Sequence, residues 1–117
     1  MPYVDGFVIP VPKANKDAYR AEAEKMWTVM RDYGAIEVWE CWGEDIPEGE
    51  VTSFPSAVRL KDDETVVFSW VIWRDREARS AAQENMLKDP RMEEMEMPFD
   101  GKRLIFGSFI PLFTARG

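Results

Sequence analysis

An acidic residue inside an apolar segment is the first candidate for chemistry. Asp5 lies in the stretch from Tyr3 to Val11, YVDGFVIPV, whose β-branched and aromatic residues predict a strand. If its strand face is covered, the carboxylate must be paired with a cation or have a raised pKa, and a raised pKa suits a general base. The alternative is an ion pair with Lys102 or Arg103 on a neighbouring strand, because structural pairs also perturb pKa values.

Glu40 is the second acidic candidate. In AIEVWECW, residues 35–42, it shares one strand face with Val38 and Trp42, so its functional interpretation is acid or base chemistry. Asp5 and Glu40 together could bind a hard cation such as Mg²⁺. Two carboxylates on non-adjacent strands are a weak metal signal, however, and neither a metal nor a cofactor is predicted. A glutamate exposed at the sheet edge is the alternative interpretation.

Aromatic residues and a few polar ones could instead form a ligand site. The chain has five tryptophans, and aromatic walls with few polar groups are typical of small-molecule pockets. The predicted ligand-binding residues are Trp42, Ser69, Trp70 and Arg103, the arginine being suited to a ligand carboxylate or phosphate. Packing in the core or at a dimer interface explains the tryptophans equally well, and an ion pair with Asp100 is the plainer role for Arg103.

The composition excludes or disfavours other kinds of site. The chain has no histidine, which excludes Ser-His-Asp and Cys-His catalysis, haem or zinc held by imidazole, and histidine pH switching. Its only cysteine, Cys41, cannot form an intrachain disulfide, so a buried inert thiol in a reducing, cytoplasmic setting is expected. The net charge of −7 disfavours nucleic acid and anionic membranes as partners, and neither a signal peptide nor a membrane span is predicted.

The pattern along the chain predicts one domain, residues 1–117, because this length is too short for two independent cores. Helices are predicted after the cap residues Asn15 and Asp75, and a short one after Asp89; Gly34 ends the first. Strands are predicted over Tyr3 to Val11, Ala35 to Trp42, Thr65 to Trp73 and Arg103 to Phe113, with a further short strand over Ser56 to Leu60. Pro10 lacks an N–H group, which predicts that the first ladder stops there.

This order of elements, β-α-β-β-α-β, is typical of the ferredoxin-like α+β fold, an antiparallel four-stranded sheet in the order 4-1-3-2 with helices on one face. Two helices cover only one face, yet the second and third strands carry large apolar residues on both, including Trp39, Trp42, Trp70 and Trp73. A second copy of the chain, packed sheet against sheet, is the simplest cover, so a homodimer is predicted.

Five short strings occur in order between Tyr3 and about Phe109. They are VDGF (4–7), ECW (40–42), FSW (68–70), DPRM (89–92) and MPFDGKR (97–103). Together they resemble the YbaA-like bacterial family, a domain of unknown function. The resemblance implies a dimeric α+β barrel fold and carries no assigned catalytic residues. The wider superfamily includes cofactor-independent monooxygenases and haem-degrading enzymes, but its haem-dependent branches rely on a histidine that this chain lacks.

We therefore expect a small cytoplasmic homodimer that binds a hydrophobic or aromatic small molecule between its sheet and helices. One alternative is a cofactor-independent monooxygenase or isomerase, with Asp5 or Glu40 as base and Ser69 or Arg103 stabilising developing negative charge. The other alternative is a non-catalytic interaction or structural dimer, in which all five tryptophans pack without leaving a cavity.

Overall fold

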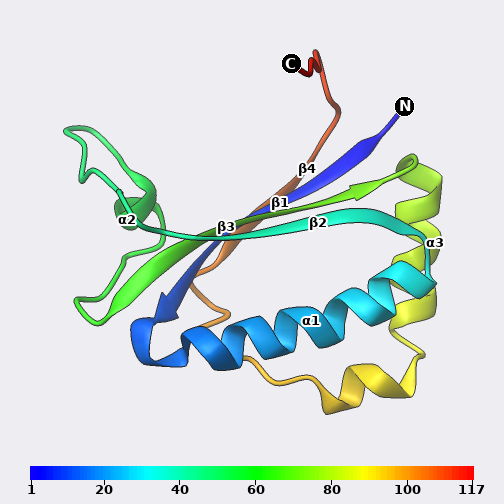
Figure 1. Ribbon diagram of the computed structural model, residues 1–117, viewed down its shortest axis with the longest axis horizontal. Helices are drawn as coiled ribbons and strands as arrows, with labels where there is room; N and C mark the ends of the chain where they lie inside the picture. Colours follow the sequence, from blue (N-terminus) through cyan, green and yellow to red (C-terminus); the bar gives the residue numbers. More distant parts are fainter.

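The computed structural model describes all 117 residues, which form a four-stranded antiparallel sheet with two long helices on one face (Figure 1). The strands are β1 (Tyr3–Pro12), β2 (Ala35–Trp42), β3 (Glu64–Trp73) and β4 (Ile105–Phe109), and the helices are α1 (Lys16–Asp32), α2 (Phe54–Ala57) and α3 (Arg76–Met86). The sheet order is β2-β3-β1-β4, so β1 and β3 are central and β2 and β4 are edges. The predicted ferredoxin-like α+β fold is confirmed.

Two of the three predicted helix starts are capped as expected, whereas the Asn15 side chain forms no cap and donates a hydrogen bond of 2.9 Å to the Pro98 carbonyl. The Asp75 carboxylate accepts a hydrogen bond of 2.8 Å from the Ala78 N–H at the start of α3. The Asp89 carboxylate accepts one of 2.9 Å from the Arg91 N–H, and a 3₁₀ turn, Pro90–Glu94, follows. Each cap satisfies a backbone donor that the first helical turn leaves free. None of the helices combines the length and apolar character needed to cross a membrane.

Gly34 ends α1 with a φ of +109°, a conformation that side chains with a Cβ rarely adopt. No atom lies within 4 Å of the position that an added Cβ would take, so only the backbone opposes a substitution. Gly34→Ala is therefore expected to lower the free energy of unfolding by about 1–3 kcal/mol, measured by urea denaturation. Gly117→Ala, in equally open space without a positive φ, is the matched control and should leave stability unchanged.

The short strand predicted over Ser56 to Leu60 is wrong, because the chain forms the single-turn helix α2 there. The Ser53 hydroxyl accepts a hydrogen bond of 3.0 Å from the Ser56 N–H, and Pro55 occupies the first turn. A serine cap followed by proline is a helix-start signal that the apolar residues beside it obscured.

Two predicted strand ends also differ from the structure. The strand predicted over Arg103 to Phe113 is reduced to β4, because the Arg103 N–H donates to the Asp100 carbonyl in the preceding turn and Pro111 has no N–H to donate. The ladder between β1 and β3 continues past Pro10 to Pro12, whereas β4 pairs with β1 only as far as Val8. Successive N–H groups of a strand point to opposite sides, and the N–H that Pro10 lacks would point toward β4. Because β4 has already ended there, the ladder with β3 loses no hydrogen bond.

Alternate residues of β1 and β3 form the core against the helices. One cluster contains Ile9, Val11, Tyr19 and Val67, and the other contains Ala35, Val71, Trp73 and Ala82. Ala82 is only 1% exposed, which shows how closely its small side chain lets α3 approach the sheet.

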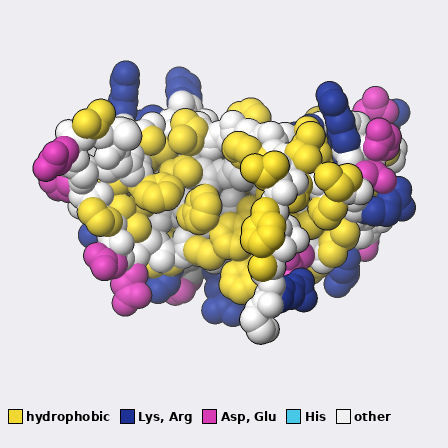
Figure 2. Space-filling model, turned by 90° about the horizontal axis from the view of Figure 1, so that it is seen from above, with side chains coloured by type: hydrophobic (Ala, Val, Ile, Leu, Met, Phe, Trp, Pro, Cys, Tyr) yellow, Lys and Arg dark blue, Asp and Glu magenta, His cyan; other side chains and the backbone are white.

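The opposite face of the sheet is apolar and is not covered by α1 or α3. Figure 2 views the molecule from this side and shows hydrophobic side chains gathered across its centre. Trp39 and Trp70 stack with ring centroids 5.6 Å apart, and Phe68 lies 5.3 Å from Trp70. Trp39, Phe68 and Phe109 are 52%, 47% and 59% exposed. Exposed aromatic groups in contact with one another are typical of an interaction surface. We call this surface the open sheet face.

Candidate ligand groove

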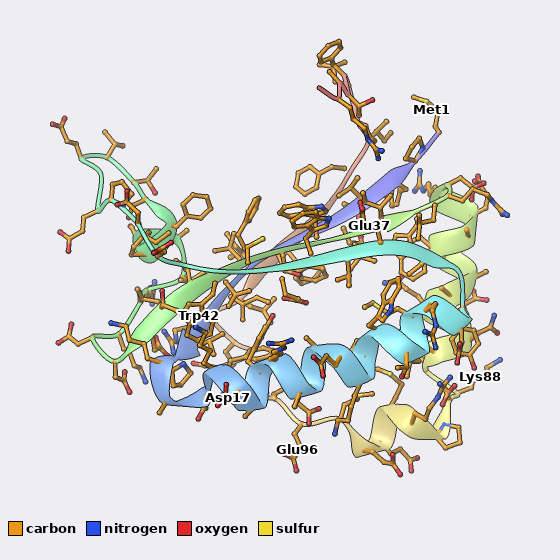
Figure 3. The ribbon with its side chains drawn as sticks, in the orientation of Figure 1. Met1, Asp17, Glu37, Trp42, Lys88 and Glu96 are labelled. Carbon is orange, nitrogen blue, oxygen red and sulfur yellow. The ribbon has the colours of Figure 1, made fainter.

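A groove of about 660 Å³ runs between α1 and the helix-facing side of β2 and β3. Trp27, Val38, Trp42 and Val67 provide its apolar walls, and charged residues of α1 border it. Figure 3 shows Trp42 between the sheet and the start of α1, where Asp17 also lies. The volume and the apolar lining are typical of a site for a small organic molecule.

Tyr19 and Glu40 form the polar centre of the groove. The Tyr19 hydroxyl donates a hydrogen bond of 2.7 Å to the Glu40 carboxylate. Part of the Glu40 side chain is exposed, but protein surrounds the carboxylate closely enough that burial raises its pKa above the ordinary 4.5; hydrogen bonds from Tyr19 and Ser69 oppose this rise. Burial, followed by the Glu40 charge, raises the pKa of Tyr19, so its hydroxyl keeps its proton and remains a donor.

One end of the groove holds a cation against an aromatic ring. The Lys16 ammonium lies 5.5 Å from the centroid of the Trp42 ring. This distance lies within the range of cation–π attraction, which a tryptophan ring supports best. The face of Trp42 is therefore a surface on which a positive charge is favourable.

A second cavity of about 350 Å³ adjoins the groove. Tyr19, Ala23 and Glu40 line both spaces, so the Tyr19–Glu40 hydrogen bond lies where they meet. The other walls are Glu22 and Met26 of α1, the methionine-rich segment after α3, and Phe99, whose ring lies 5.8 Å from that of Tyr19. Flexible thioether side chains let such a wall adapt to the shape of an occupant.

The structure brings together only two of the four residues predicted to bind a ligand. Trp42 lines the groove, and Ser69, which is 2% exposed, lies beneath it as the strand partner of Glu40. Trp70 lies on the open sheet face, stacked on Trp39. Arg103 is bonded at the end of the sheet, as described below. The alternation of strand side chains separates Trp42 from Trp70, so aromatic content alone could not define one site.

Asp5 is structural in this arrangement, and the partner expected for it is wrong. The carboxylate, 8% exposed, accepts hydrogen bonds of 3.0 Å from both Arg79 and Trp73 and one of 2.6 Å from Ser108. Arg79, rather than Lys102 or Arg103, supplies the positive charge, because α3 packs over this end of β1. Three donors hold the buried carboxylate, and Asp5 lines neither of the two cavities.

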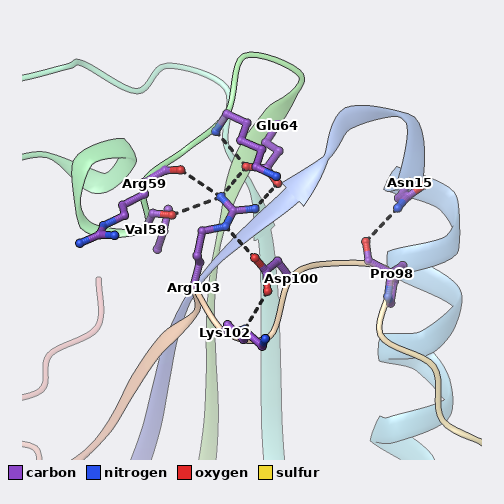
Figure 4. A network of polar contacts seen from close by, with 9 residues as sticks. Asn15, Val58, Arg59, Glu64, Pro98, Asp100, Lys102 and Arg103 are labelled. Atoms are coloured by element: carbon purple, nitrogen blue, oxygen red, sulfur yellow. Dashed lines mark hydrogen bonds and ion pairs between the residues drawn. The ribbon is translucent and has the colours of Figure 1, made fainter.

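Arg103 joins three segments at the other end of the sheet (Figure 4). Its guanidinium forms a bidentate contact with Glu64, at 2.6 and 2.8 Å, and bonds to Asp100 at 2.9 Å. It also donates to the carbonyls of Val58 and Arg59. The predicted pair with Asp100 is therefore present. Glu64 is a second partner, which accepts two hydrogen bonds from Arg103 where Asp100 accepts one. With its donors used in this way, Arg103 holds the chain together and does not face the groove.

The Glu64–Arg103 pair predicts acid sensitivity. The hydrogen bonds from Arg103 lower the pKa of Glu64 below its ordinary 4.5 in the folded chain. A carboxyl group with a depressed folded pKa stabilises the protein above its unfolded pKa, and this stability is lost as the pH falls through the folded value. Urea midpoints measured between pH 7 and pH 3 should fall with acid, and Glu64→Gln should be less stable at pH 7 with a flatter acid limb. A parallel acid limb in the variant would contradict this role.

Sequence reasoning did not single out Lys16 or Tyr19 as site residues. Tyr19 is one of the buried residues of α1. The available signal was the spacing of Lys16, Tyr19, Ala23 and Trp27 on one side of this helix, opposite a strand that carries Glu40. Cys41, expected to be buried, is half-buried and free.

The sheet order and the two helices on one face define the ferredoxin-like class of α+β proteins. An uncharacterised NIPSNAP domain protein from Burkholderia xenovorans has a similar structure, with a TM-score of 0.61 and 16% identity over the whole of both chains. A dimeric ferredoxin-like protein from an uncultured marine organism gives a TM-score of 0.53 at 12% identity, covering 98% of this chain and 100% of the other. At such low identity these likenesses establish the fold alone.

The chain belongs to the family described as "Protein of unknown function (DUF1428)", which matches residues 2–101. It is 50% identical over 111 residues to the "Uncharacterized protein YbaA" of Escherichia coli K12, covering 93% of this chain and 95% of the relative. The corresponding protein of Shigella flexneri matches to the same extent. The resemblance to the YbaA-like family is thereby confirmed.

Proposed function

We propose that this protein is a small cytoplasmic homodimer that binds a hydrophobic or aromatic small molecule between α1 and the sheet. The observation that carries the proposal is the groove of about 660 Å³, with Trp27 and Trp42 in its walls. A core needs no such space, since protein interiors are close-packed. The lone free thiol of Cys41 fits a reducing compartment.

The proposal predicts where an aromatic probe binds. On titration with 3-ethylindole, an uncharged probe, the indole N–H signals of Trp27 and Trp42 should shift in ¹H–¹⁵N spectra, while that of Trp39 should not. Trp42→Leu removes part of the groove wall and should weaken binding about tenfold, equivalent to about 1.4 kcal/mol. Trp39→Leu alters the same strand on its other face and should leave binding unchanged. Shifts confined to Trp39 and Trp70, or none at all, would overturn the proposal.

The homodimer half of the proposal rests on the open sheet face. Trp39, Phe68 and Phe109 are large, apolar and about half exposed, and they lie on one continuous sheet. A two-fold axis would bury the same patch on both copies, sheet against sheet. One structure with the same fold is described as a dimeric ferredoxin-like protein.

A second candidate function is proton transfer at Glu40 on a molecule bound in the groove. The observation that favours it is the raised pKa of this carboxyl group, which places it closer to neutral pH than an ordinary glutamate. Asp5 is a poorer base because Arg79, Trp73 and Ser108 occupy both of its oxygens. If the protein has turnover, Glu40→Gln should abolish it while the aromatic walls of the groove still bind the uncharged probe 3-ethylindole; unchanged turnover would exclude this role.

A further inference from the structure

The charge around the groove and the adjoining cavity is unbalanced. The residues that line the two spaces carry two cations and five carboxylates, counting Glu40 once. The cations are Lys16 and Arg20, and the carboxylates belong to Asp17, Glu22, Glu24, Glu40 and Glu96. Lys25, which lines neither space, pairs with Glu22 at 2.8 Å, so four of the five carboxylates remain against the two cations. The whole chain is also acidic, with a net charge of −7. The potential inside a cleft lined mainly by one sign of charge favours ligands of the opposite sign.

Glu40 lies on the sheet side of the groove, on the same strand face as Val38 and Trp42, and has no cation of its own. Its only side-chain hydrogen-bond donors are the uncharged hydroxyls of Tyr19 and Ser69. Arg20 forms its ion pair with Glu24, at 3.1 Å and with both side chains largely exposed. A carboxylate in a cleft with apolar walls and no cation of its own gains more from a positive partner than one on open surface does.

The aromatic wall beside Glu40 also accepts positive charge. Lys16 places its ammonium 5.5 Å from the Trp42 ring centroid, from the outer end of the groove. Lysine is held there by a flexible four-carbon stem and has no salt bridge in the structure, so a ligand can displace it. The groove therefore combines a flat aromatic surface with an unpaired carboxylate, which is the chemistry that recognises organic ammonium ions.

We infer that the ligand of the groove is an amine, whose protonated nitrogen bonds to Glu40 and whose flat apolar body lies against Trp42 and Trp27. This inference rests on the proposed function and names its ligand class. The rival class, an anionic ligand held by Lys16 and Arg20, would place its charge beside Glu40 and bring no counter-charge for that carboxylate. The excess of carboxylates around both spaces opposes it as well.

Three probes with one aromatic body test this inference by isothermal titration calorimetry on the intact protein. Tryptamine carries an ammonium group, indole-3-propionate a carboxylate on a chain of similar length, and 3-ethylindole no charge. Tryptamine should bind about 10- to 100-fold more tightly than 3-ethylindole, the range expected for a hydrogen bond to a charged group, and indole-3-propionate more weakly than either. Glu40→Gln should remove the advantage of tryptamine, so that tryptamine and 3-ethylindole bind this variant with similar affinity, and Glu84→Gln, on exposed α3 surface, is the matched control that keeps the advantage.

The pH dependence gives a second readout in the wild-type protein. An alkylamine, like the lysine side chain with a pKa of about 10.4, stays protonated throughout the acidic range. Tryptamine affinity should therefore weaken as acid protonates Glu40, whose raised pKa places this change above pH 4.5, while 3-ethylindole affinity stays constant. Tyr19 and Ser69 contact Glu40 directly, and Lys16, Asp17, Arg20, Glu24, Glu22 and Glu96 face the same two spaces; Glu40→Gln separates its titration from theirs.

The outcomes distinguish the two proposals. Tight binding of tryptamine that depends on Glu40 supports both. Equal binding of the three probes, or a preference for indole-3-propionate, overturns the amine inference and leaves the small-molecule groove standing. Binding of none of them, in a protein that retains its fold, overturns both. If Glu40→Gln does not fold, the ranking of the three probes on the wild-type protein still decides the inference.

Discussion

Asp5→Ala is expected to lower the free energy of unfolding by about 3 kcal/mol, the lower end of the range for breaking a buried ion pair. The substitution leaves Arg79 without its carboxylate and also removes the acceptor of Trp73 and Ser108. Because the Arg79 side chain is 20% exposed, water can solvate its charge in the variant, which reduces the loss of stability. Urea unfolding at pH 7, followed by tryptophan fluorescence, measures the change.

Two further variants test whether the loss of stability in Asp5→Ala comes from the contacts of its carboxylate. Asp62→Ala, in an exposed turn, should change stability by no more than about 0.5 kcal/mol. Asp5→Asn keeps the shape and an acceptor oxygen but removes the charge, so its loss should lie between those of the wild type and Asp5→Ala, and it remains measurable if the alanine variant does not fold. Wild-type stability in Asp5→Ala would show that the network contributes nothing to the fold.

Trp39→Lys is expected to convert the proposed dimer into a monomer, raising the dissociation constant roughly 100-fold or more. Central tryptophans of an interface contribute strongly to binding, and a lysine on each copy would place like charges within the same symmetric contact. Sedimentation velocity and native mass spectrometry on untagged protein read the oligomer mass directly. The mass spectrum of the wild type also reveals any small molecule that remains bound after purification.

The control for Trp39→Lys is Leu87→Lys, which replaces an exposed apolar residue after α3 with the same charge. It should leave the oligomer mass unchanged. A monomeric wild-type protein at micromolar concentration would contradict the dimer proposal and leave the open sheet face without an assigned cover. The groove would be unaffected, because it lies within one chain between α1 and the sheet.

Local patterns in the sequence determined the order of elements and most of their ends. The periodicity of apolar residues predicts β2 over Ala35 to Trp42, with the bounds that the structure has. Asp75 and Asp89 cap the segments that follow them, and Gly34 ends α1 with the positive φ that its position required. These features depend on contacts within a few residues, which is why sequence alone predicts them. Alternation along β2 likewise put Glu40 and Trp42 on one face and Trp39 on the other.

Only the tertiary structure decided which charged group meets which. Asp5 contacts Arg79, 74 residues away, because α3 crosses the end of β1. Glu40 accepts a hydrogen bond from Tyr19 because α1 lies under β2. The spacing of α1 from the sheet, which opens the groove, likewise depends on packing between distant segments. Fold class and caps follow from short-range preferences of the chain, whereas ion pairs and cavities depend on distances that exist only after folding. The sequence by itself thus determined the scaffold and its candidate acids, and the tertiary structure decided that Asp5 stabilises the fold while Glu40 faces the groove.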